Sequence, residues 1–188
     1  MRAERGVRLV LADRDGVLNE DRPNGVRRPQ ELVLLPGAAE AVRRLNEAGI
    51  PIALATNQSI VGRGLITASE LDAIHQRLQS ELARLAGAKL DLILFAPDHP
   101  AHPGPDRKPA PGMLLKAMKQ FEVLAEDAVM IGDDCRDIQA AAAAGCRRIL
   151  VRTGKGTDLE REGIPAALQP VELCDSFADA IQRLLRSP

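Results

Sequence analysis

The sequence predicts an α/β fold in which helices cover both faces of a central parallel β-sheet, a three-layer αβα sandwich. Short apolar runs rich in Val, Ile and Leu alternate with helical segments along the 188 residues, and this alternation is typical of a parallel sheet. The runs are continuously apolar, as expected for strands buried on both faces. The length suits one unit, so we expect a single domain over residues 1–188.

The first strand is expected over residues 7–12, where the sequence reads VRLVLA. The helical segment 37–49 follows and ends on Gly49, a residue type suited to a helix C-terminal cap. The second strand is expected over residues 50–56, IPIALAT. These elements begin the strand–helix alternation.

The next helix, residues 67–87, carries end signals on both sides. Thr67 and Glu70 have the spacing of a capping box, and Gly87 closes the segment. The third strand is expected over residues 90–96, LDLILFA. The first half of the chain therefore supplies three strands and two helices to the fold.

The second half continues the same alternation. Helices are expected over residues 111–121, 136–145 and 176–187, and strands over residues 128–132 and 147–153. Five consecutive alanines in one helix are typical of packing against a sheet. The connecting segment 96–112 holds six of the 13 prolines, and we expect a stiff loop because proline fixes φ and removes a backbone donor.

Composition excludes several classes of function. The 25 basic and 26 acidic residues leave a net charge of −1, and there is no Trp or Tyr, which argues against nucleic-acid binding. No apolar run approaches the roughly 20 residues that span a bilayer, and the N-terminal segment is not a secretory signal. The three cysteines are widely spaced, which fits neither a disulfide framework nor a zinc site. We expect a cytoplasmic monomer that acts on a small molecule.

Charged and polar side chains follow the predicted strands at their carboxyl ends. They are Asp13 and Asp15 after the first strand, Thr56 on the second, Lys108 after the third, and Asp133 and Asp134 after the fourth. Ligands bind outside the carboxyl ends of open α/β sheets, so these side chains should converge. Carboxylates that lie so close repel each other unless a cation separates them. Oxygen ligands favour a hard divalent ion, most simply Mg²⁺.

Four motifs occur in the order found in haloacid dehalogenase-like (HAD-like) phosphatases. They are DRDGVLN, ATNQS, DRKPAPGML and GDDCRDIQAA, and on them the chain resembles this family. The segments TNQS, GRG and LVRTGKG are similar to its histidinol-phosphate and heptose-bisphosphate branch. The resemblance implies a Rossmann-like αβα sandwich. The short spacing between motifs leaves no room for a separate cap domain.

The resemblance also implies a division of roles among the motif residues. Asp13 would be the nucleophile that forms an aspartyl-phosphate. Asp15 would be the general acid and then the general base, a role that calls for a raised pKa. Thr56 and Lys108 would hold the phosphoryl oxygens. Asp133 would complete the Mg²⁺ site with Asp13 and the backbone carbonyl of Asp15.

The substrate implied by the resemblance is a sugar bisphosphate. The reaction would be hydrolysis of the 7-phosphate of D-glycero-D-manno-heptose 1,7-bisphosphate to heptose 1-phosphate, a step toward the lipopolysaccharide core. Arg107 would grip the second phosphate, because a guanidinium binds phosphate in a bidentate way. The other expected substrate contacts, besides Thr56 and Lys108, are Asp21, Arg22, Pro23, Asn24, Asn57, Gln58, Ser59 and Asp134.

Two alternatives stay open at this point. The same chemistry could serve histidinol phosphate or another small phosphomonoester. A receiver-type signalling domain, which is not an enzyme, also gathers Asp, Thr and Lys around Mg²⁺ on a flavodoxin-like sheet. Steady phosphate release would indicate the enzyme, whereas stable phosphorylation without turnover would indicate the receiver.

Two departures from the family pattern bear on cofactors and substrate. Many relatives bind a structural zinc before the lysine motif, but this chain has Ala96, Asp98, Gly104 and Asp106 at the corresponding positions. His99 and His102 alone make a poor zinc site, so no structural zinc is expected. Relatives often carry lysine at the position of Asp134. We expect His75, among polar neighbours, to be solvated, and Lys155 to be a surface residue or a peripheral phosphate contact.

Overall fold

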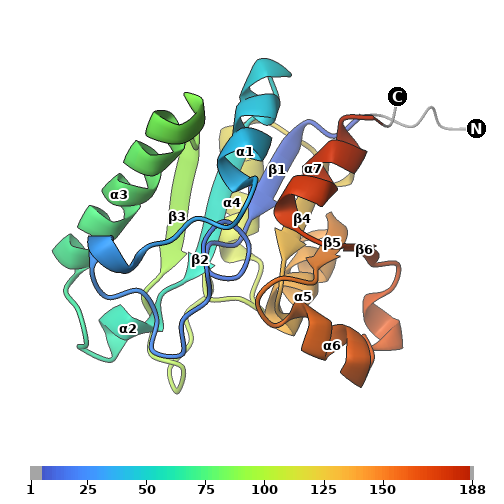
Figure 1. Cartoon of the computed structure of the whole chain (residues 1–188). Helices are drawn as coiled ribbons and strands as arrows, with labels where there is room; N and C mark the ends of the chain where they lie inside the picture. The colour runs from blue at the N-terminus through green and yellow to red at the C-terminus, as the bar shows by residue number, and fades with distance from the viewer. Residues whose placement is uncertain (1–5, 187–188) are drawn as a thin grey trace, which may run out of the picture.

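Six parallel strands form one sheet in the computed structural model, which describes residues 6–186 (Figure 1). The strands are β1 (Leu9–Ala12), β2 (Ile52–Asn57), β3 (Leu92–Ala96), β4 (Ala128–Gly132), β5 (Arg147–Val151) and β6 (Glu172–Cys174). Their order in the sheet is β3-β2-β1-β4-β5-β6, and every neighbouring pair is parallel. The chain therefore reverses direction across the sheet between β1 and β4, where a ligand crevice is expected.

Helices cover both faces of the sheet, as predicted. Figure 1 shows α1 (Ala38–Glu47), α3 (Ala68–Ala86) and α7 (Phe177–Leu184) in front of the sheet, with α4 (Gly112–Gln120) and α5 (Cys135–Ala144) behind it. Alternate residues of β1 point to the two layers: Val10 joins the front core and Leu11 joins the rear core. This explains the continuous apolar run of β1, because both of its faces are buried.

The elements predicted from sequence are all present, within a few residues of the expected bounds; residue 187, the end of the last predicted helix, lies outside the described residues. The capping box at the start of α3 is confirmed, since the Glu70 backbone N–H donates to Thr67 Oγ1 at 3.2 Å and Thr67 N–H donates to Glu70 Oε2 at 2.7 Å. Gly87 ends this helix in the left-handed conformation, with φ +63°. No helix within residues 6–186 has the length and apolar composition needed to cross a membrane.

Several short elements were not predicted. They are β6, α2 (Ser59–Gly62), α6 (Gly156–Glu162), and three 3₁₀ turns at Pro29–Glu31, Ala125–Asp127 and Ala166–Leu168. None is longer than seven residues, and so short a segment shows no clear periodic spacing of apolar residues from which a helix or strand could be predicted. α2 and α6 lie at the lower edge of the view in Figure 1, on either side of the carboxyl ends of the central strands.

The strand order is incompatible with the receiver-type alternative. In the flavodoxin-like order, β3 is the neighbour of β1, so that residues after both strands share one site. In this chain β3 is the edge strand and pairs with β2. β4 takes the place beside β1. The residue that follows β4, Asp133, is therefore brought next to Asp13, which follows β1.

Candidate active site

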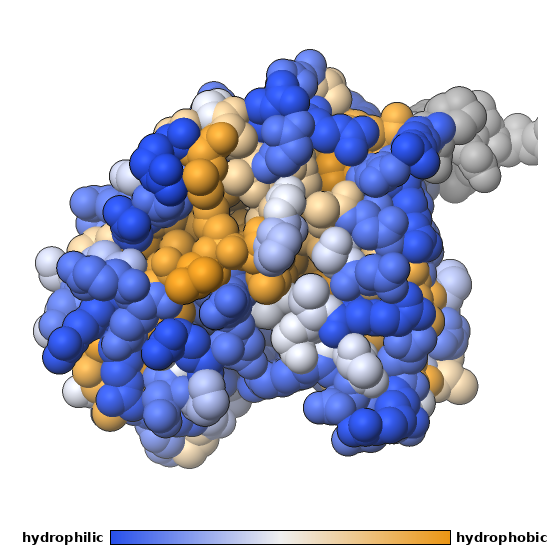
Figure 2. Space-filling view, in the orientation of Figure 1, coloured by the Kyte–Doolittle hydropathy of each residue, from blue (hydrophilic) through white to orange (hydrophobic). Residues whose placement is uncertain are grey.

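A polar pocket of about 380 Å³ lies at the carboxyl ends of the central strands. Figure 2 shows it as a hollow at the lower edge of the molecule, bordered mainly by hydrophilic residues. The predicted site residues that line it are Asp13, Asp15, Asp21, Arg22, Pro23, Asn24, Asn57, Gln58, Ser59, Arg107, Lys108, Asp133 and Asp134. Thr56 does not line the pocket but lies beneath it, where its Oγ1 accepts a hydrogen bond from Gln58 Nε2 at 2.9 Å.

Three aspartates form a compact cluster at one end of the pocket. One carboxylate oxygen each from Asp13, Asp133 and Asp137 lies within 4.8 Å of the others. Asp13 follows β1, Asp133 follows β4 and Asp137 lies in the first turn of α5. Burial raises the pKa of Asp133 to about 8, with further contributions from Asp13 and Asp137. The cluster therefore holds more negative charge than the buried site favours, and three hard oxygen ligands fit Mg²⁺.

Two glycines allow the chain to close around Asp133. A Cβ atom on Gly16 would lie 2.2 Å from Asp133 Oδ2, and one on Gly154 would lie 2.0 Å from the same atom. Both glycines also have positive φ, +79° and +58°. Only glycine tolerates both the close approach to Asp133 and the positive φ, which explains why Gly16 follows the DRD sequence.

Lys108 supplies a buried positive charge next to the aspartates. Its Nζ lies 3.1 Å from Asp13 Oδ1 and 2.6 Å from Asp137 Oδ1. Burial lowers the pKa of Lys108, but Asp13 and Asp137 outweigh burial and hold it above the ordinary value. The lysine therefore stays protonated. Asn57 fixes its backbone, donating to the Lys108 carbonyl at 2.9 Å and accepting from its N–H at 3.0 Å.

The Asp15 carboxylate lies outside the aspartate cluster. It accepts hydrogen bonds from three side chains, Arg14, Asn19 and Gln58, at 2.9 to 3.2 Å. Burial raises the pKa of Asp15, but these partners together outweigh burial, so its pKa lies below the ordinary value. The expectation of a raised pKa was wrong, because the sequence does not reveal that Arg14 folds back onto its neighbour.

His75 is buried, whereas we expected it to be solvated. Its side chain comes from α3 and lies against Arg14, with Nε2 3.4 Å from the Arg14 NH1 atom. Its ring also packs against Phe95, with centroids 5.6 Å apart. The polar neighbours in sequence were misleading. His75 shares the buried face of the helix with Leu71 and Leu78, four residues before it and three after it.

Sequence reasoning missed several residues of the site, among them Arg14, Asn19, Arg136 and Asp137. Asp137 could have been found, because it lies four residues after Asp133 inside the quoted fourth motif, where a helix begins. Arg14 gave no such signal. A charged residue between two aspartates reads as exposed, yet its side chain is fully buried.

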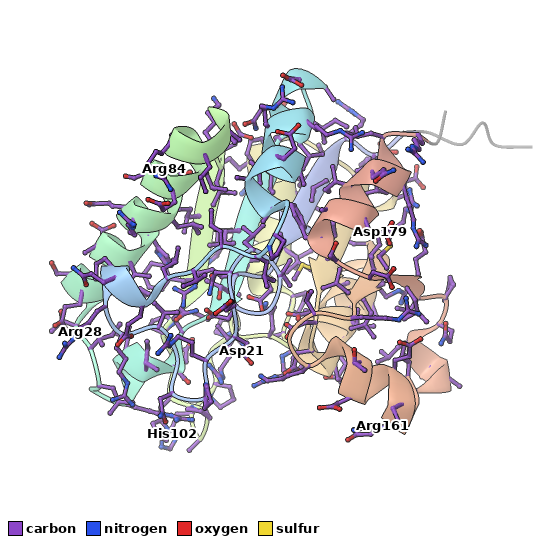
Figure 3. All side chains as sticks on the ribbon, in the orientation of Figure 1. Asp21, Arg28, Arg84, His102, Arg161 and Asp179 are labelled. Atoms are coloured by element: carbon purple, nitrogen blue, oxygen red, sulfur yellow. The ribbon has the colours of Figure 1, made fainter. Side chains whose placement is uncertain are left out.

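Basic side chains surround the opening of the pocket: Arg22, Arg27, Arg63, Arg107, Arg136 and Lys155. Burial lowers the pKa of Arg107, and the nearby positive charges of Arg136 and Arg63 lower it further. Figure 3 shows Asp21 at the edge of the hollow, whereas Arg28 lies away from it near α3. A second anionic group entering the pocket would therefore meet concentrated positive charge.

Asp134, which stands where relatives often have lysine, forms ion pairs within this rim. Arg136 donates to both of its oxygens, at 3.0 and 2.7 Å, and Lys155 Nζ lies 3.4 Å from Oδ2. Burial raises the pKa of Asp134, but Arg136 and Lys155 hold it well below the usual range. The side chain also caps α5, accepting from the Arg136 N–H. Asp134 therefore places a negative charge in this rim, which its two cationic partners balance.

Hydrogen bonds tie the proline-rich loop to its surroundings. Gln58 N–H donates to the Ala96 carbonyl at 2.8 Å, and Gly62 N–H donates to the Pro97 carbonyl at 2.9 Å. Within the loop, Arg107 NH1 donates to the Asp98 carbonyl at 3.2 Å. Among residues 6–186, the aspartate cluster is the only group of His, Cys, Asp and Glu side chains that meets the geometry of a metal site. That this loop needs no zinc stays a prediction.

This chain is similar to several known proteins. A sequence model of the HAD-hydrolase-like family matches residues 106–180. The D-glycero-beta-D-manno-heptose-1,7-bisphosphate 7-phosphatase of Bordetella bronchiseptica is 38% identical over 181 residues, covering 96% of this chain and 99% of that protein. The D-glycero-D-manno-heptose-1,7-bisphosphate 7-phosphatase of Thermosynechococcus vestitus is 39% identical, covering 92% and 93% of the two chains.

Solved structures agree with these sequence matches. The crystal structure of the B. bronchiseptica D,D-heptose 1,7-bisphosphate phosphatase, complexed with magnesium and phosphate, has a TM-score of 0.90 and 37% identity. The match covers 97% of this chain and all of that chain. The corresponding phosphatase of Burkholderia thailandensis has a TM-score of 0.72 and 34% identity, with 95% and 99% coverage.

Proposed function

This chain belongs to the heptose-1,7-bisphosphate 7-phosphatase family of HAD-like hydrolases, phosphoric monoester hydrolases, and we propose that it hydrolyses the 7-phosphate of D-glycero-D-manno-heptose 1,7-bisphosphate. The observation that carries this proposal is the pairing of a buried Asp and Lys cluster with a basic rim in one pocket. The cluster suits the reacting phosphate, and the rim suits a second one. That the enzyme acts as a monomer stays a prediction.

Asp13 is the proposed nucleophile. One of its oxygens attacks phosphorus, the bond from phosphorus to the sugar O7 breaks, and the leaving oxygen takes a proton from Asp15. Water then attacks the aspartyl-phosphate while Asp15 removes its proton. The bond between phosphorus and the Asp13 oxygen breaks, releasing inorganic phosphate and restoring both carboxyl groups to their starting states.

Lys108 and the pocket floor prepare Asp13 for attack. The Lys108 ammonium, 3.1 Å from Asp13 Oδ1, offsets the repulsion between an anionic nucleophile and an anionic ester. Thr56 does not line the pocket; it supports the wall through Gln58, and its contact with a phosphoryl oxygen stays a prediction. The lowered pKa of Asp15 makes it a strong acid once protonated, and a phosphate dianion beside it favours the protonated form.

Mg²⁺ is the proposed cofactor, held by Asp13, Asp133 and the backbone carbonyl of Asp15, with Asp137 close by. The raised pKa of Asp133 supports this proposal, since a divalent cation would relieve the crowding of like charges. When bound, Mg²⁺ neutralises charge on the phosphoryl oxygens. The related B. bronchiseptica phosphatase was crystallised with magnesium and phosphate.

Arg107 and Arg136 are the proposed ligands of the second phosphate. Both line the pocket, and their mutual repulsion would be relieved by an anion between them. Arg63 lies near enough to Arg107 to lower its pKa as well. Asp21 to Asn24 and Asn57 to Ser59 line the remaining wall and are the proposed contacts for the sugar.

Phosphate release from a substrate panel tests the proposal. The panel comprises the heptose 1,7-bisphosphate, the matching 7-monophosphate and histidinol phosphate. We expect the bisphosphate to have the highest kcat/KM, and Arg136→Ala to lower that value at least about tenfold, equivalent to about 1.4 kcal/mol, without a comparable effect on the monophosphate. Preferred turnover of histidinol phosphate would contradict the substrate assignment, and equal losses on both heptose phosphates would contradict the role of Arg136.

A further inference from the structure

Arg14 lies between the two proposed catalytic aspartates in the sequence, and its side chain is fully buried. Its guanidinium donates to Asp15 three times: Nε to Oδ1 at 3.2 Å, and NH2 to Oδ1 at 3.0 Å and to Oδ2 at 2.9 Å. Arg14 does not line the pocket, whereas Asp15 does. The arginine is therefore placed behind Asp15, out of reach of a substrate.

Two further side chains hold Arg14 in this position. Gln58 Oε1 accepts from Arg14 NH2 at 3.1 Å, and His75 Nε2 lies 3.4 Å from Arg14 NH1. Gln58 also donates to Asp15 Oδ2 at 2.9 Å, so it contacts both members of the ion pair. His75 comes from α3, 61 residues away in sequence, and as a neutral imidazole it can accept from Arg14.

Asp15 is separated from the aspartate cluster by these contacts. It is two residues from Asp13, so a free Asp15 carboxylate could reach a cation bound at Asp13 and Asp133. A guanidinium fork that engages both of its oxygens competes with such a cation. Environment can assign two neighbouring carboxylates to different chemical roles.

We propose that Arg14 is a positioning residue: supported by Gln58 and His75, it holds the Asp15 carboxylate in the pocket and out of the cluster of Asp13, Asp133 and Asp137. The inference rests on the acid–base role proposed for Asp15. Its consequence is specific. Loss of Arg14 leaves the nucleophile in place and removes proton transfer.

Leaving-group dependence tests the proposal. A sugar oxygen needs a proton in order to leave, whereas p-nitrophenolate does not. In single-turnover experiments, Arg14→Met should slow cleavage of the heptose bisphosphate about 100-fold, within the range usual for general acid–base catalysis. Cleavage of p-nitrophenyl phosphate should change less than about threefold, and the substrate concentration that gives half the maximal single-turnover rate should stay within about threefold. The slow second step should then produce a burst of p-nitrophenolate.

Variants of His75, which lies in α3, test the positioning role of Arg14 without changing Arg14 itself. His75→Leu removes the acceptor for Arg14, and His75→Gln retains an acceptor. We expect His75→Leu to show the same leaving-group selectivity more weakly, about tenfold, and His75→Gln to restore most of the rate. These variants decide the question if Arg14→Met does not fold. Leu78→Ala, which removes a buried side chain from the same helix, should lower Tm while keeping the ratio of the two substrate rates.

Asp15→Asn separates this inference from the proposed function. If Asp15→Asn discriminates between the two leaving groups and Arg14→Met slows both equally, the positioning role is overturned and the mechanism stands. If Asp15→Asn slows both leaving groups equally, the acid–base role of Asp15 is itself wrong. Equal rates for His75→Leu and His75→Gln would also overturn the positioning role.

Discussion

The protonation state of a side chain in this site depends on its burial and its partners more than on its residue type. Arg14 is the most buried charged residue near the pocket, and His75 behind it is held neutral. Burial lowers the pKa of His75 to about 4, with Arg14 contributing in the same direction. Lys108 shows the opposite balance, because two carboxylates outweigh its burial. Both effects stabilise one protonation state at neutral pH.

The lowered pKa of His75 predicts a loss of stability in acid. The unfolded chain takes up this proton near pH 6.5, whereas the folded protein resists it until about pH 4. The stabilisation is therefore complete above pH 6.5 and is lost as the pH falls toward 4. Between pH 7 and pH 4.5 the unfolding free energy of the wild type should fall about 2 to 3 kcal/mol more than that of His75→Gln. Urea unfolding at both pH values measures this difference, and parallel changes in the two proteins would contradict it.

Asp13→Asn should abolish turnover, because an amide is a poor nucleophile. We expect less than about a thousandth of the wild-type rate, equivalent to about 4 kcal/mol of barrier. Phosphate release gives the rate, and acid quenching with labelled substrate should trap phosphoprotein in the wild type alone. Retention of more than about a tenth of the activity would rule out covalent catalysis through Asp13.

Close packing between short elements fixes the geometry of the pocket wall. α2 contacts the proline-rich loop through Gly62, whose N–H donates to the Pro97 carbonyl at 2.9 Å. A Cβ atom at Gly62 would lie 2.4 Å from that oxygen and 2.6 Å from the His99 nitrogen. Both are backbone atoms, so the clash can be relieved only if the loop moves. The same loop carries Lys108.

Gly62→Ala should therefore affect both stability and catalysis. Overpacking of this kind costs about 1 to 3 kcal/mol, and displacement of Lys108 should lower kcat about tenfold or more. Gly64→Ala is a matched control, because no atom lies within 4 Å of its Cβ position although its φ is +69°. The strain at Gly64 should cost about 1 kcal/mol without changing kcat. Urea unfolding and steady-state kinetics report the two effects, and an unchanged kcat for Gly62→Ala would contradict the link between α2 and the site.

At the scale of the whole molecule, the aspartate cluster links metal binding to folding. Asp13, Asp133 and Asp137 come from β1, the end of β4 and α5, so the cluster exists only when these elements are packed together. A ligand that binds the folded state alone raises the free energy of unfolding by mass action. Metal binding should therefore be visible in stability as well as in activity.

We expect Mg²⁺ to restore activity after chelation and to raise Tm. At a concentration a hundred times its Kd, the gain should be about 2.7 kcal/mol, and Asp133→Asn should remove most of it. Thermal unfolding with and without Mg²⁺ measures the shift. Elemental analysis of protein purified without added metal should find no stoichiometric zinc, and its presence would contradict our account of the proline-rich loop.

The sequence by itself determined the longer elements and the residues at their ends. Continuous apolar runs marked the five longer strands, and a capping box marked the start of α3, because burial and capping leave local patterns. The same logic placed Asp13 and Asp133 at the carboxyl edge of the sheet. Motif spacing added Lys108, which now lies between Asp13 and Asp137. Each of these inferences needs only a few neighbouring residues.

Tertiary structure alone decided which partners those residues meet. The contact between Arg14 and His75 joins residues 61 positions apart, so no local pattern contains it. Both side chains are buried, and Arg14 lowers the pKa of Asp15, which the sequence suggested would be raised. The order of β3 and β4 around β1 was likewise invisible in the alternation of strands and helices. Local pattern determines whether a segment is a strand or a helix, whereas the charge state of a buried group depends on neighbours that only the folded chain brings together.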